Sequence, residues 1–177
     1  MPHVHTRKGG RSAADRRILG LGLVPHPEGG YFREVYRSDE SLAASALPVR
    51  FGGRRAFSTS IYFLLKSGEP SRFHRLRSDE LWHFYAGGPL RIHILGKKGG
   101  YRSIDLGRRP AAGQAYQAAV PRGSWFGAEV LRMHSYSLIG CTIAPGFDFA
   151  DFALARRSDL LKRFPRRKAL IERLTAG

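Results

Sequence analysis

The sequence predicts a mainly β protein, folded as an antiparallel sandwich or barrel, with a short helix before it and helices after it. Three observations predict this fold. Short strand-forming segments follow one another between residues 31 and 144. Turns rich in glycine and proline separate most of them, which is typical of antiparallel sandwiches and barrels. After residue 145, hydrophobic residues recur at helical spacing instead of alternating.

Length and composition indicate one domain with a full hydrophobic core, because the chain has 177 residues and is 42% hydrophobic. Hydrophobic runs all fall short of the roughly 20 residues that span a bilayer. The polar N-terminus has no apolar signal segment, so we expect a cytoplasmic protein without membrane contact. Cys141 is the single cysteine, which fits a reducing compartment, and its apolar surroundings predict a buried, inert thiol.

The net charge of +16 comes from 30 lysines and arginines against 14 acidic residues, and it would attract anions such as nucleic acid. The basic residues are spread along the chain and gather mainly near its two ends. They are not accompanied by a zinc-finger, helix-turn-helix or aromatic RNA-binding signature. We therefore expect no nucleic-acid partner, and interpret the charge as a basic surface.

Residues 1–11 are polar, basic and contain glycine, which predicts a disordered tail, and a single domain is expected over residues 12–177. Ser12 can cap a short helix whose first turn contains Asp15, where the helix dipole favours a negative charge. A turn, HPEGG, follows at residues 26–30. Its histidine and glutamate either reach the mouth of a pocket or, more simply, shape the entry into the first strand.

The expected strands alternate between two faces, as half-buried strands do. They cover residues 31–37, 56–65, 71–76, 80–86, 90–95, 101–106, 115–120, 124–128 and 134–144. The stretch 38–55 is expected to be an irregular polar loop. Asp148 and Asp151 are interpreted as loop and capping residues. A helical tail is expected from about residue 154, with Pro165 dividing it into two helices.

The segment HRLRSDELWHFYAGG contains the strongest functional signal. His74 stands six residues before Glu80, and a Gly-Gly turn closes the segment at residues 87 and 88. This spacing is typical of a metal-binding β-hairpin, except that Leu76 occupies the place where a second histidine would be expected. The question is whether this incomplete site binds a metal, performs acid–base chemistry or only holds a small molecule.

These residues resemble the first motif of the cupin superfamily, G-x5-H-x-H-x3/4-E-x6-G, with Gly68, His74, Glu80 and Gly87 in register. Pro121 and Gly123 match the second motif, but Phe126 stands at its histidine and Val130 at its asparagine. The blocks that resemble one subgroup, cupin_5 (domain of unknown function 985), are HPEGGYFRE, STSIYFLL, SDELWHFYAG, VPRGSWF and APGFDFADFALA. The resemblance implies an RmlC-like jelly roll, often a homodimer, and no defined activity.

The departures from the cupin pattern argue against a metal. A typical cupin site uses three histidines and one glutamate, and two of these are replaced here by Leu76 and Phe126. His83 lies on the strand face opposite to Glu80, and the sequence alone cannot place His93 and His134. Tight zinc or iron sites normally have at least three protein ligands. We expect no cofactor; if a divalent metal binds, His74 and Glu80 would hold it.

Both motif positions are expected to point into the barrel, together with aromatic residues on the same strand faces. The result would be an apolar, aromatic-walled cavity with a few polar groups, which is typical of small-molecule sites. Arg33 is a candidate anchor for an anionic group. The expected substrate contacts are Ser60, Tyr62, Trp82, Phe84, Phe126 and Arg33.

The leading hypothesis is a metal-independent enzyme acting on a small molecule as an isomerase, epimerase or dehydratase-type lyase. His74 and Glu80 would be its catalytic proton-transfer pair, since aromatic walls raise a carboxyl pKa towards neutrality and histidine titrates there anyway. Two alternatives remain: a ligand-binding or sensing cupin without chemistry, and a residual metal-dependent cupin enzyme. The inward pair could also simply hydrogen-bond to each other as a relic.

Overall fold

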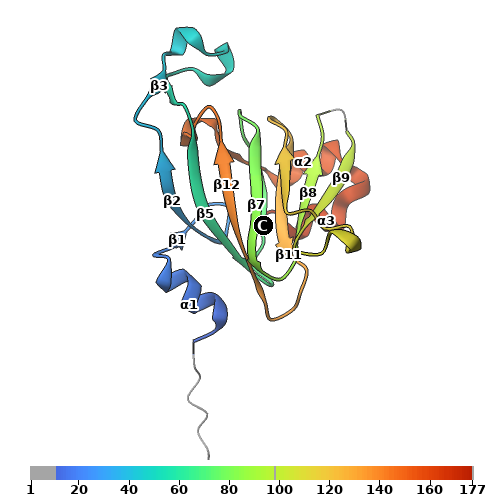
Figure 1. Cartoon of the computed structure of the whole chain (residues 1–177). Coiled ribbons are helices and arrows are strands. Elements are labelled where there is room, and N and C mark those ends of the chain that lie inside the picture. The colour runs from blue at the N-terminus through green and yellow to red at the C-terminus, as the bar shows by residue number, and fades with distance from the viewer. Residues whose placement is uncertain (1–10, 98, 177) are drawn as a thin grey trace, which may run out of the picture.

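The computed structural model describes residues 11–97 and 99–176 and shows an antiparallel jelly roll of two facing sheets (Figure 1). The six-stranded sheet has the order β1-β2-β5-β12-β7-β10, and the five-stranded sheet has the order β13-β6-β11-β8-β9. The strands are β1 (Val24–Pro25), β2 (Tyr31–Arg37), β3 (Ser41–Leu42), β4 (Arg55–Ala56), β5 (Thr59–Lys66), β6 (Ser71–Arg75), β7 (Glu80–Gly87), β8 (Leu90–Leu95), β9 (Tyr101–Leu106), β10 (Gln117–Val120), β11 (Trp125–Val130), β12 (Tyr136–Ile143) and β13 (Ala153–Leu154).

The main core lies between the two sheets, where alternate strand residues meet. Phe63 from β5, Trp82 from β7 and Ile139 from β12 are almost fully buried against Ile92 from β8. Each such side chain contributes about 1.5–3 kcal/mol to folding when it leaves water. The expected single antiparallel sandwich is therefore confirmed as a fold class, and the core fixes which strand face looks inward.

The N-terminal helix α1 (Ala13–Gly20) begins where the capping residue predicts. Ser12 Oγ accepts a hydrogen bond from the Asp15 backbone N–H at 3.1 Å, and the Asp15 carboxylate accepts one in return from the Ser12 backbone. This reciprocal capping box satisfies two helix-end donors. The helix packs on the outer face of the six-stranded sheet, where Leu64 and Leu138 are buried beneath it.

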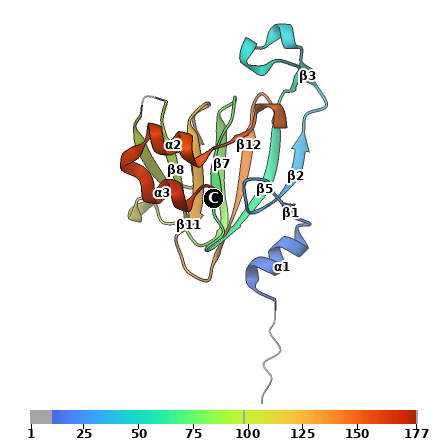
Figure 2. The same cartoon turned by 180° about the vertical axis from the view of Figure 1, so that it is seen from behind.

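The C-terminal helices α2 (Arg157–Arg163) and α3 (Lys168–Arg173) cover the outer face of the five-stranded sheet (Figure 2). Pro165 separates them, as predicted, and begins the short 3-10 helix η5 (Pro165–Arg167). The helical tail begins at Arg157 and not near residue 154. The reason is that Ala153 and Leu154 extend the five-stranded sheet by pairing with β6.

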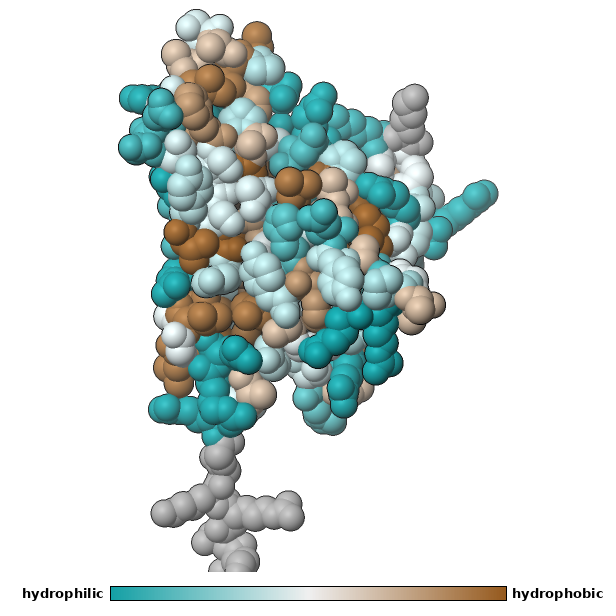
Figure 3. Space-filling view, in the orientation of Figure 1, coloured by the Kyte–Doolittle hydropathy of each residue, from teal (hydrophilic) through white to brown (hydrophobic). Residues whose placement is uncertain are grey.

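Residues 38–55 form an arm that projects from the barrel, and the expectation of a wholly irregular loop is wrong (Figure 1). Strands β3 and β4 pair at its base, and the 3-10 helices η1 (Ala44–Ala46) and η2 (Val49–Phe51) follow each other towards its tip. Val49 is 98% exposed. On the face drawn in Figure 3, exposed apolar residues lie in separate patches between hydrophilic ones.

Two further short elements complete the chain, the 3-10 helices η3 (Pro110–Ala112) and η4 (Phe149–Asp151). Within the described residues, each helix is too short or too polar to cross a membrane. The tail expected to be disordered, residues 1–11, lies outside the described residues except for Arg11.

Candidate functional site

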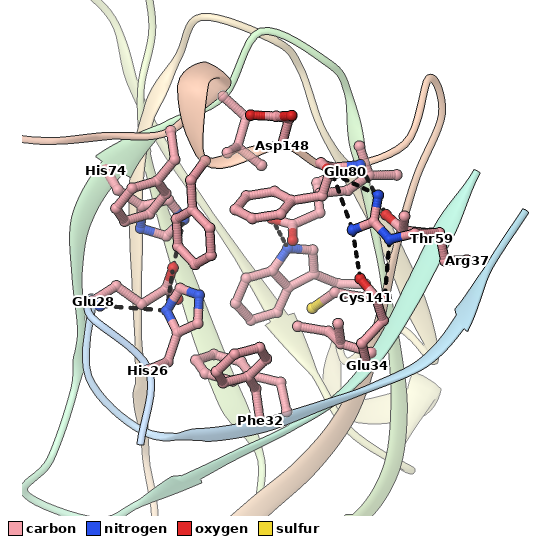
Figure 4. Close-up of a pocket in the computed structure, with 18 residues that line it drawn as sticks. His26, Glu28, Phe32, Glu34, Arg37, Thr59, His74, Glu80, Cys141 and Asp148 are labelled. Carbon is pink, nitrogen blue, oxygen red and sulfur yellow. Dashed lines mark hydrogen bonds and ion pairs between the residues drawn. The ribbon is translucent and has the colours of Figure 1, made fainter. Parts of the chain in front are cut away.

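A cavity of about 360 Å³ lies inside the barrel and is walled by strands of both sheets, the HPEGG turn and the segment that follows β12 (Figure 4). Its volume falls at the lower end of the range for small-molecule sites. The walls combine aromatic and aliphatic side chains with a few ionisable ones. The ionisable residues that line it are His26, Glu28, Glu34, Arg37, His74, Glu80, Cys141 and Asp148.

Glu80 lies at the start of β7 with its carboxyl group turned into this cavity, as the motif register predicts. The Trp82 indole N–H donates a hydrogen bond to Glu80 Oε2 at 2.8 Å. Burial raises the pKa of Glu80 from 4.5 to about 7, although hydrogen bonds from Trp82 and the Cys141 thiol lower it. A carboxyl group with this pKa exchanges a proton readily near neutral pH.

His74 on β6 also lines the cavity, but its partner is not Glu80. Its Nδ1–H donates to the Arg72 carbonyl oxygen at 2.8 Å, and its Nε2 lies 3.2 Å from Glu28 Oε2. The Phe126 ring packs on the imidazole with 4.0 Å between ring centroids. Burial lowers the pKa of His74 to about 3, so the imidazole is neutral at physiological pH. Among the described residues, the alternative of a direct His74–Glu80 hydrogen bond is therefore wrong.

The HPEGG turn, between β1 and β2, supplies two further site residues. Glu28 is buried, and its Oε1 accepts a hydrogen bond from Ser71 Oγ at 2.7 Å. His26 Nδ1 accepts a hydrogen bond from the Glu28 backbone N–H at 3.3 Å, which leaves the proton on Nε2. The interpretation that this turn only shapes the entry into the first strand is thus wrong. The signal in the sequence was a histidine and a glutamate two residues apart beside a cavity strand.

Burial sets the protonation of this cluster. It raises the pKa of Glu28 well above its usual range, and repulsion from Glu80 adds to the rise. It lowers the pKa of His26 to about 4. A protonated Glu28 can then donate from Oε2 to the free Nε2 of His74. The arrangement is a neutral acid–imidazole pair in which one proton can move between the two groups without a change in total charge.

The rim of the cavity carries an ion pair from β2. Arg37 donates to both carboxylate oxygens of Glu34, at 2.9 and 2.7 Å, and to the Phe147 carbonyl oxygen at 3.2 Å. These two strand residues are three apart, yet both line the cavity, because a β-bulge shifts the register between Glu34 and Tyr36. Asp148, expected as a loop and capping residue, caps η4 and also reaches the rim.

Three of the expected substrate contacts lie on the outside of the barrel, so their placement in the cavity is wrong. The guanidinium of Arg33 lies over the Tyr62 ring at 5.8 Å. Ser60 Oγ is 3.2 Å from Thr142 Oγ1. The cavity side of β5 is the opposite one, with Thr59, Ile61 and Phe63. Strand alternation separates the two faces but does not say which of them is inside.

Trp82 lines the cavity as expected, whereas Phe84 and Phe126 do not. Phe126 points inward but lies behind His74, with its ring centroid 6.3 Å from that of Trp82. Phe84 packs partly on the core and lines a separate surface hollow beside Gly87 and Leu131. Both aromatics therefore support the walls from outside the cavity.

The residues do not fit the metal that the cupin pattern implies. Leu76 lines the cavity where a histidine would coordinate, and the Phe126 ring fills the other vacated place. His93 lies between Tyr101 and Glu129, with hydrogen bonds of 2.9 and 3.0 Å, and does not line the cavity. Within the described part of the chain, no group of three or more His, Cys, Asp or Glu side chains is arranged so that it could hold a metal ion.

A metal analysis checks this conclusion. Protein purified without chelators is expected to contain far less than one equivalent of iron, zinc, nickel or manganese, because tight sites need at least three protein ligands and the described side chains form no such group. Inductively coupled plasma mass spectrometry on the untagged chain gives the number. Stoichiometric metal that is lost in a His74→Ala variant would contradict the conclusion.

The fold and the inward-facing motif residues define a cupin. A model of the cupin_5 family, described as Cupin superfamily (DUF985), matches residues 15–155, and the chain belongs to this family. The uncharacterized protein YML079W of Saccharomyces cerevisiae is 30% identical over 161 residues, covering 85% of this chain and 79% of that protein.

Solved structures agree with this assignment. Protein SO0799 from Shewanella oneidensis is 39% identical with a TM-score of 0.84, covering 95% of this chain and 99% of that one. A hypothetical protein from Leishmania major is 36% identical, also with a TM-score of 0.84, covering 94% and 100%. Oxalate decarboxylase from Bacillus subtilis, at 18% identity and a TM-score of 0.52, covers 85% of this chain and 36% of that one, and shows the fold alone.

Proposed function

We propose that this cupin binds a small, largely apolar molecule in the barrel and transfers protons to and from it without a metal, as an isomerase, epimerase or dehydratase-type lyase does. The observation that carries the proposal is the state of Glu80. It is 6% exposed, lines the cavity, and has a pKa raised by burial to about 7. A general base works best when its pKa lies near the operating pH.

In this proposal Glu80 and the Glu28–His74 pair divide the work. The Glu80 carboxylate takes a proton from a carbon next to a carbonyl or similar group, and the electron pair left behind moves onto that group. The protonated Glu28–His74 pair returns a proton to the substrate elsewhere. The two units differ in their hydrogen bonds, with Trp82 beside Glu80 and Ser71 beside Glu28, so their protons need not leave together.

His74 has a narrower role here than the catalytic histidine expected from the sequence. With its pKa lowered to about 3 it is not a proton store at neutral pH. Its Nε2 accepts from Glu28, so it moves a proton only together with that carboxyl group. His26 is a neutral hydrogen-bond donor through Nε2, which faces the cavity in Figure 4, and it can polarise an acceptor oxygen of the substrate.

Solvent deuterium uptake tests the proposal without knowledge of the substrate. A panel of small carbonyl and hydroxy compounds is incubated with the protein in heavy water and examined by mass spectrometry. We expect deuterium to enter a specific compound with the native chain, and the rate to fall by about 10²–10⁴-fold in Glu80→Gln. Glu69→Gln, at an exposed residue that pairs with Lys66 across the turn between β5 and β6, is the matched control and should keep the native rate.

The same experiment separates this function from its alternative. A compound that binds and is recovered without deuterium would indicate a ligand-binding or sensing cupin. Uptake that is equal in the native chain and in Glu80→Gln would remove Glu80 from the chemistry and contradict the proposal. Homodimer formation remains a prediction, and light scattering of the native chain tests it.

A further inference from the structure

The residues that line the cavity are mainly acidic, whereas the chain as a whole is strongly basic. Basic residues outnumber acidic ones by 30 to 14 in the sequence. The cavity, in contrast, is lined by four acidic residues, Glu28, Glu34, Glu80 and Asp148, and by one charged base, Arg37. That arginine is already bound by Glu34 and by a carbonyl oxygen. Among the described residues that line the cavity, an anion therefore finds no unpaired positive charge, although the surface as a whole attracts anions.

Among the described residues, the two buried carboxyl groups of the cavity form no ion pair with a lysine or arginine; Arg72 lowers the pKa of Glu28 through its charge but donates its hydrogen bonds to the Glu28 and Pro27 carbonyl oxygens. Glu28 and Glu80 are each 6% exposed, and the imidazoles next to them are neutral because burial lowers their pKa values. The hydrogen bonds to these carboxyl groups come from Ser71, Trp82 and Cys141, none of which carries a positive charge. A buried carboxylate is stable only with a paired charge, so a cationic group in the cavity would complete this arrangement.

Aromatic rings gather at the mouth of the same cavity. Phe147, Phe149 and Phe152 lie edge to face, with ring centroids 5.0, 6.2 and 6.4 Å apart, and His26 stacks on Phe149 at 6.2 Å. Thr59 Oγ1 accepts from the Phe147 backbone N–H at 2.9 Å, which fixes the segment to β5. Several aromatic rings beside carboxylates are the usual means of binding an organic ammonium group.

We propose that the ligand of this cavity is a small organic cation, an amine or quaternary ammonium compound. Its apolar body lies in the barrel, and its charged group meets the rings of Phe147, Phe149 and Phe152 and the carboxylates of Glu34, Glu80 and Asp148. The inference rests on the proposed function in one respect, because it takes this cavity as the ligand site. It adds the chemical class of the ligand, which the proton-transfer proposal leaves open.

Binding of a cation and ionisation of Glu80 are expected to be coupled. The titratable groups that face Glu80 from other elements are Glu28 and Cys141, and burial raises the pKa of each well above its usual value. A nearby positive charge lowers the pKa of Glu80 from about 7 and favours its carboxylate form. Binding of a cation should therefore strengthen as the pH rises from about 6 to about 8, and it should release protons.

Three probes of the same shape and different charge test the inference: benzylamine, benzyl alcohol and benzoate, titrated calorimetrically into the native chain at about pH 6 and about pH 8. Benzylamine is expected to bind about tenfold more tightly than either of the others at the higher pH. Its preference should shrink at the lower pH, in Glu80→Gln and in Phe152→Leu. Glu69→Gln is the matched control and should behave like the native chain.

Each other outcome overturns the inference in a recognisable way. If benzyl alcohol binds as tightly as benzylamine, the ligand class is neutral; if benzoate binds more tightly, it is anionic. Neither result would contradict the proton-transfer proposal. A lack of binding by all three probes at the higher pH would also refute the cation. Amines that bind but are recovered from incubation in heavy water without deuterium would instead support the ligand class and refute the proton transfer.

Discussion

Replacing Glu80 by glutamine is expected to raise the free energy of unfolding relative to the native chain as the pH rises. The gain should be about 3 kcal/mol larger at about pH 8 than at about pH 4. Glu80 has a folded-state pKa of about 7 against an ordinary value of 4.5. A difference of one pKa unit corresponds to ~1.4 kcal/mol, so the whole difference corresponds to about 3 kcal/mol. The side chain is buried, and its charge is therefore poorly screened by solvent.

The sign follows from which state loses the proton first. Below about pH 4.5 the carboxyl group is protonated in both states and has no effect on the pH dependence. Between pH 4.5 and about 7 the unfolded chain ionises while the folded chain keeps its proton, so the free energy of unfolding falls as the pH rises. Above about 7 both states are ionised and the loss is complete. Glutamine does not titrate and does not suffer this loss.

Urea unfolding of both proteins across this pH range measures the effect. The difference between the two free energies of unfolding should be constant below about pH 4.5, rise, and level off above 7. His26 titrates in both proteins and cancels to first order in the difference. Glu28 does not cancel fully, because the variant removes the repulsion from Glu80 that helps to raise the pKa of Glu28, and this change has the same sign as the main effect. Glu69→Gln should show a difference that is almost flat. A flat difference for Glu80→Gln would contradict the burial and the ionisation described for this carboxyl group.

Loss of the buried ion pair between Arg55 and Asp151 is expected to destabilise the fold by about 3–5 kcal/mol. Arg55 Nε and Nη2 donate to the two Asp151 carboxylate oxygens, both at 2.7 Å, and Nη2 also donates to the Phe51 carbonyl oxygen at 2.6 Å. Each side chain is 5% exposed. Removing Asp151 leaves the Arg55 charge buried and unpaired, and removing Arg55 leaves Asp151 with only the more distant Arg77, whose Nε lies 3.7 Å from Oδ1.

This pair also connects the projecting arm to the cavity rim. Arg55 is in β4 at the base of the arm, and Asp151 is in η4 between two of the rim phenylalanines. Asp151 was expected to be a loop and capping residue. That expectation is wrong, because the side chain is buried and its carboxylate binds Arg55. Loss of the pair should therefore weaken ligand binding as well as stability.

Chemical denaturation of Arg55→Ala and Asp151→Asn gives the expected loss. The double variant Arg55→Met with Asp151→Leu should recover most of it, since a well-packed apolar pair removes the unpaired charge. Lys168→Ala breaks an exposed pair with Glu172, at 3.9 Å, and should cost no more than about 0.5 kcal/mol. A loss below about 1 kcal/mol in the Arg55→Ala variant would contradict the buried, bidentate geometry.

The strand series was largely predictable because local pattern and tertiary structure agree there. The expected strands at 90–95 and 101–106 coincide with β8 and β9, and the first strand at 31–37 coincides with β2. The arm at 38–55 was not predictable, since its two short strands depend on each other and not on local hydrophobic periodicity. Likewise, β13 exists only because β6 provides an edge for it.

The strand alternation predicted which residues of β6 and β7 reach the cavity, but it did not predict how a β-bulge changes that alternation in β2. The motif register placed His74, Glu80 and Trp82 in the cavity, where the structure has them. Strict alternation could not reveal that Arg37 shares a cavity face with Glu34, because the β-bulge between them adds a residue.

The partner of His74 could not be predicted either. Glu28 is 46 positions earlier in the sequence, and only the path of the HPEGG turn brings the two together. The positions of the rim phenylalanines could not be predicted for the same reason, because only the turn after β12 brings them back to the mouth of the barrel. Contacts of this kind depend on the route of the chain in space and leave no periodic signal.

A titration of the Glu80 carboxyl carbon in the ligand-free native chain measures directly the pKa on which the proposed proton transfer depends. Glutamate labelled with carbon-13 at the side-chain carboxyl group allows NMR detection, and the Glu80 signal is the one absent from Glu80→Gln. We expect a midpoint near pH 7, shifted downward when benzylamine is added. A midpoint near the ordinary value of 4.5 would show a solvated carboxyl group and would refute the proposal that Glu80 exchanges protons at neutral pH.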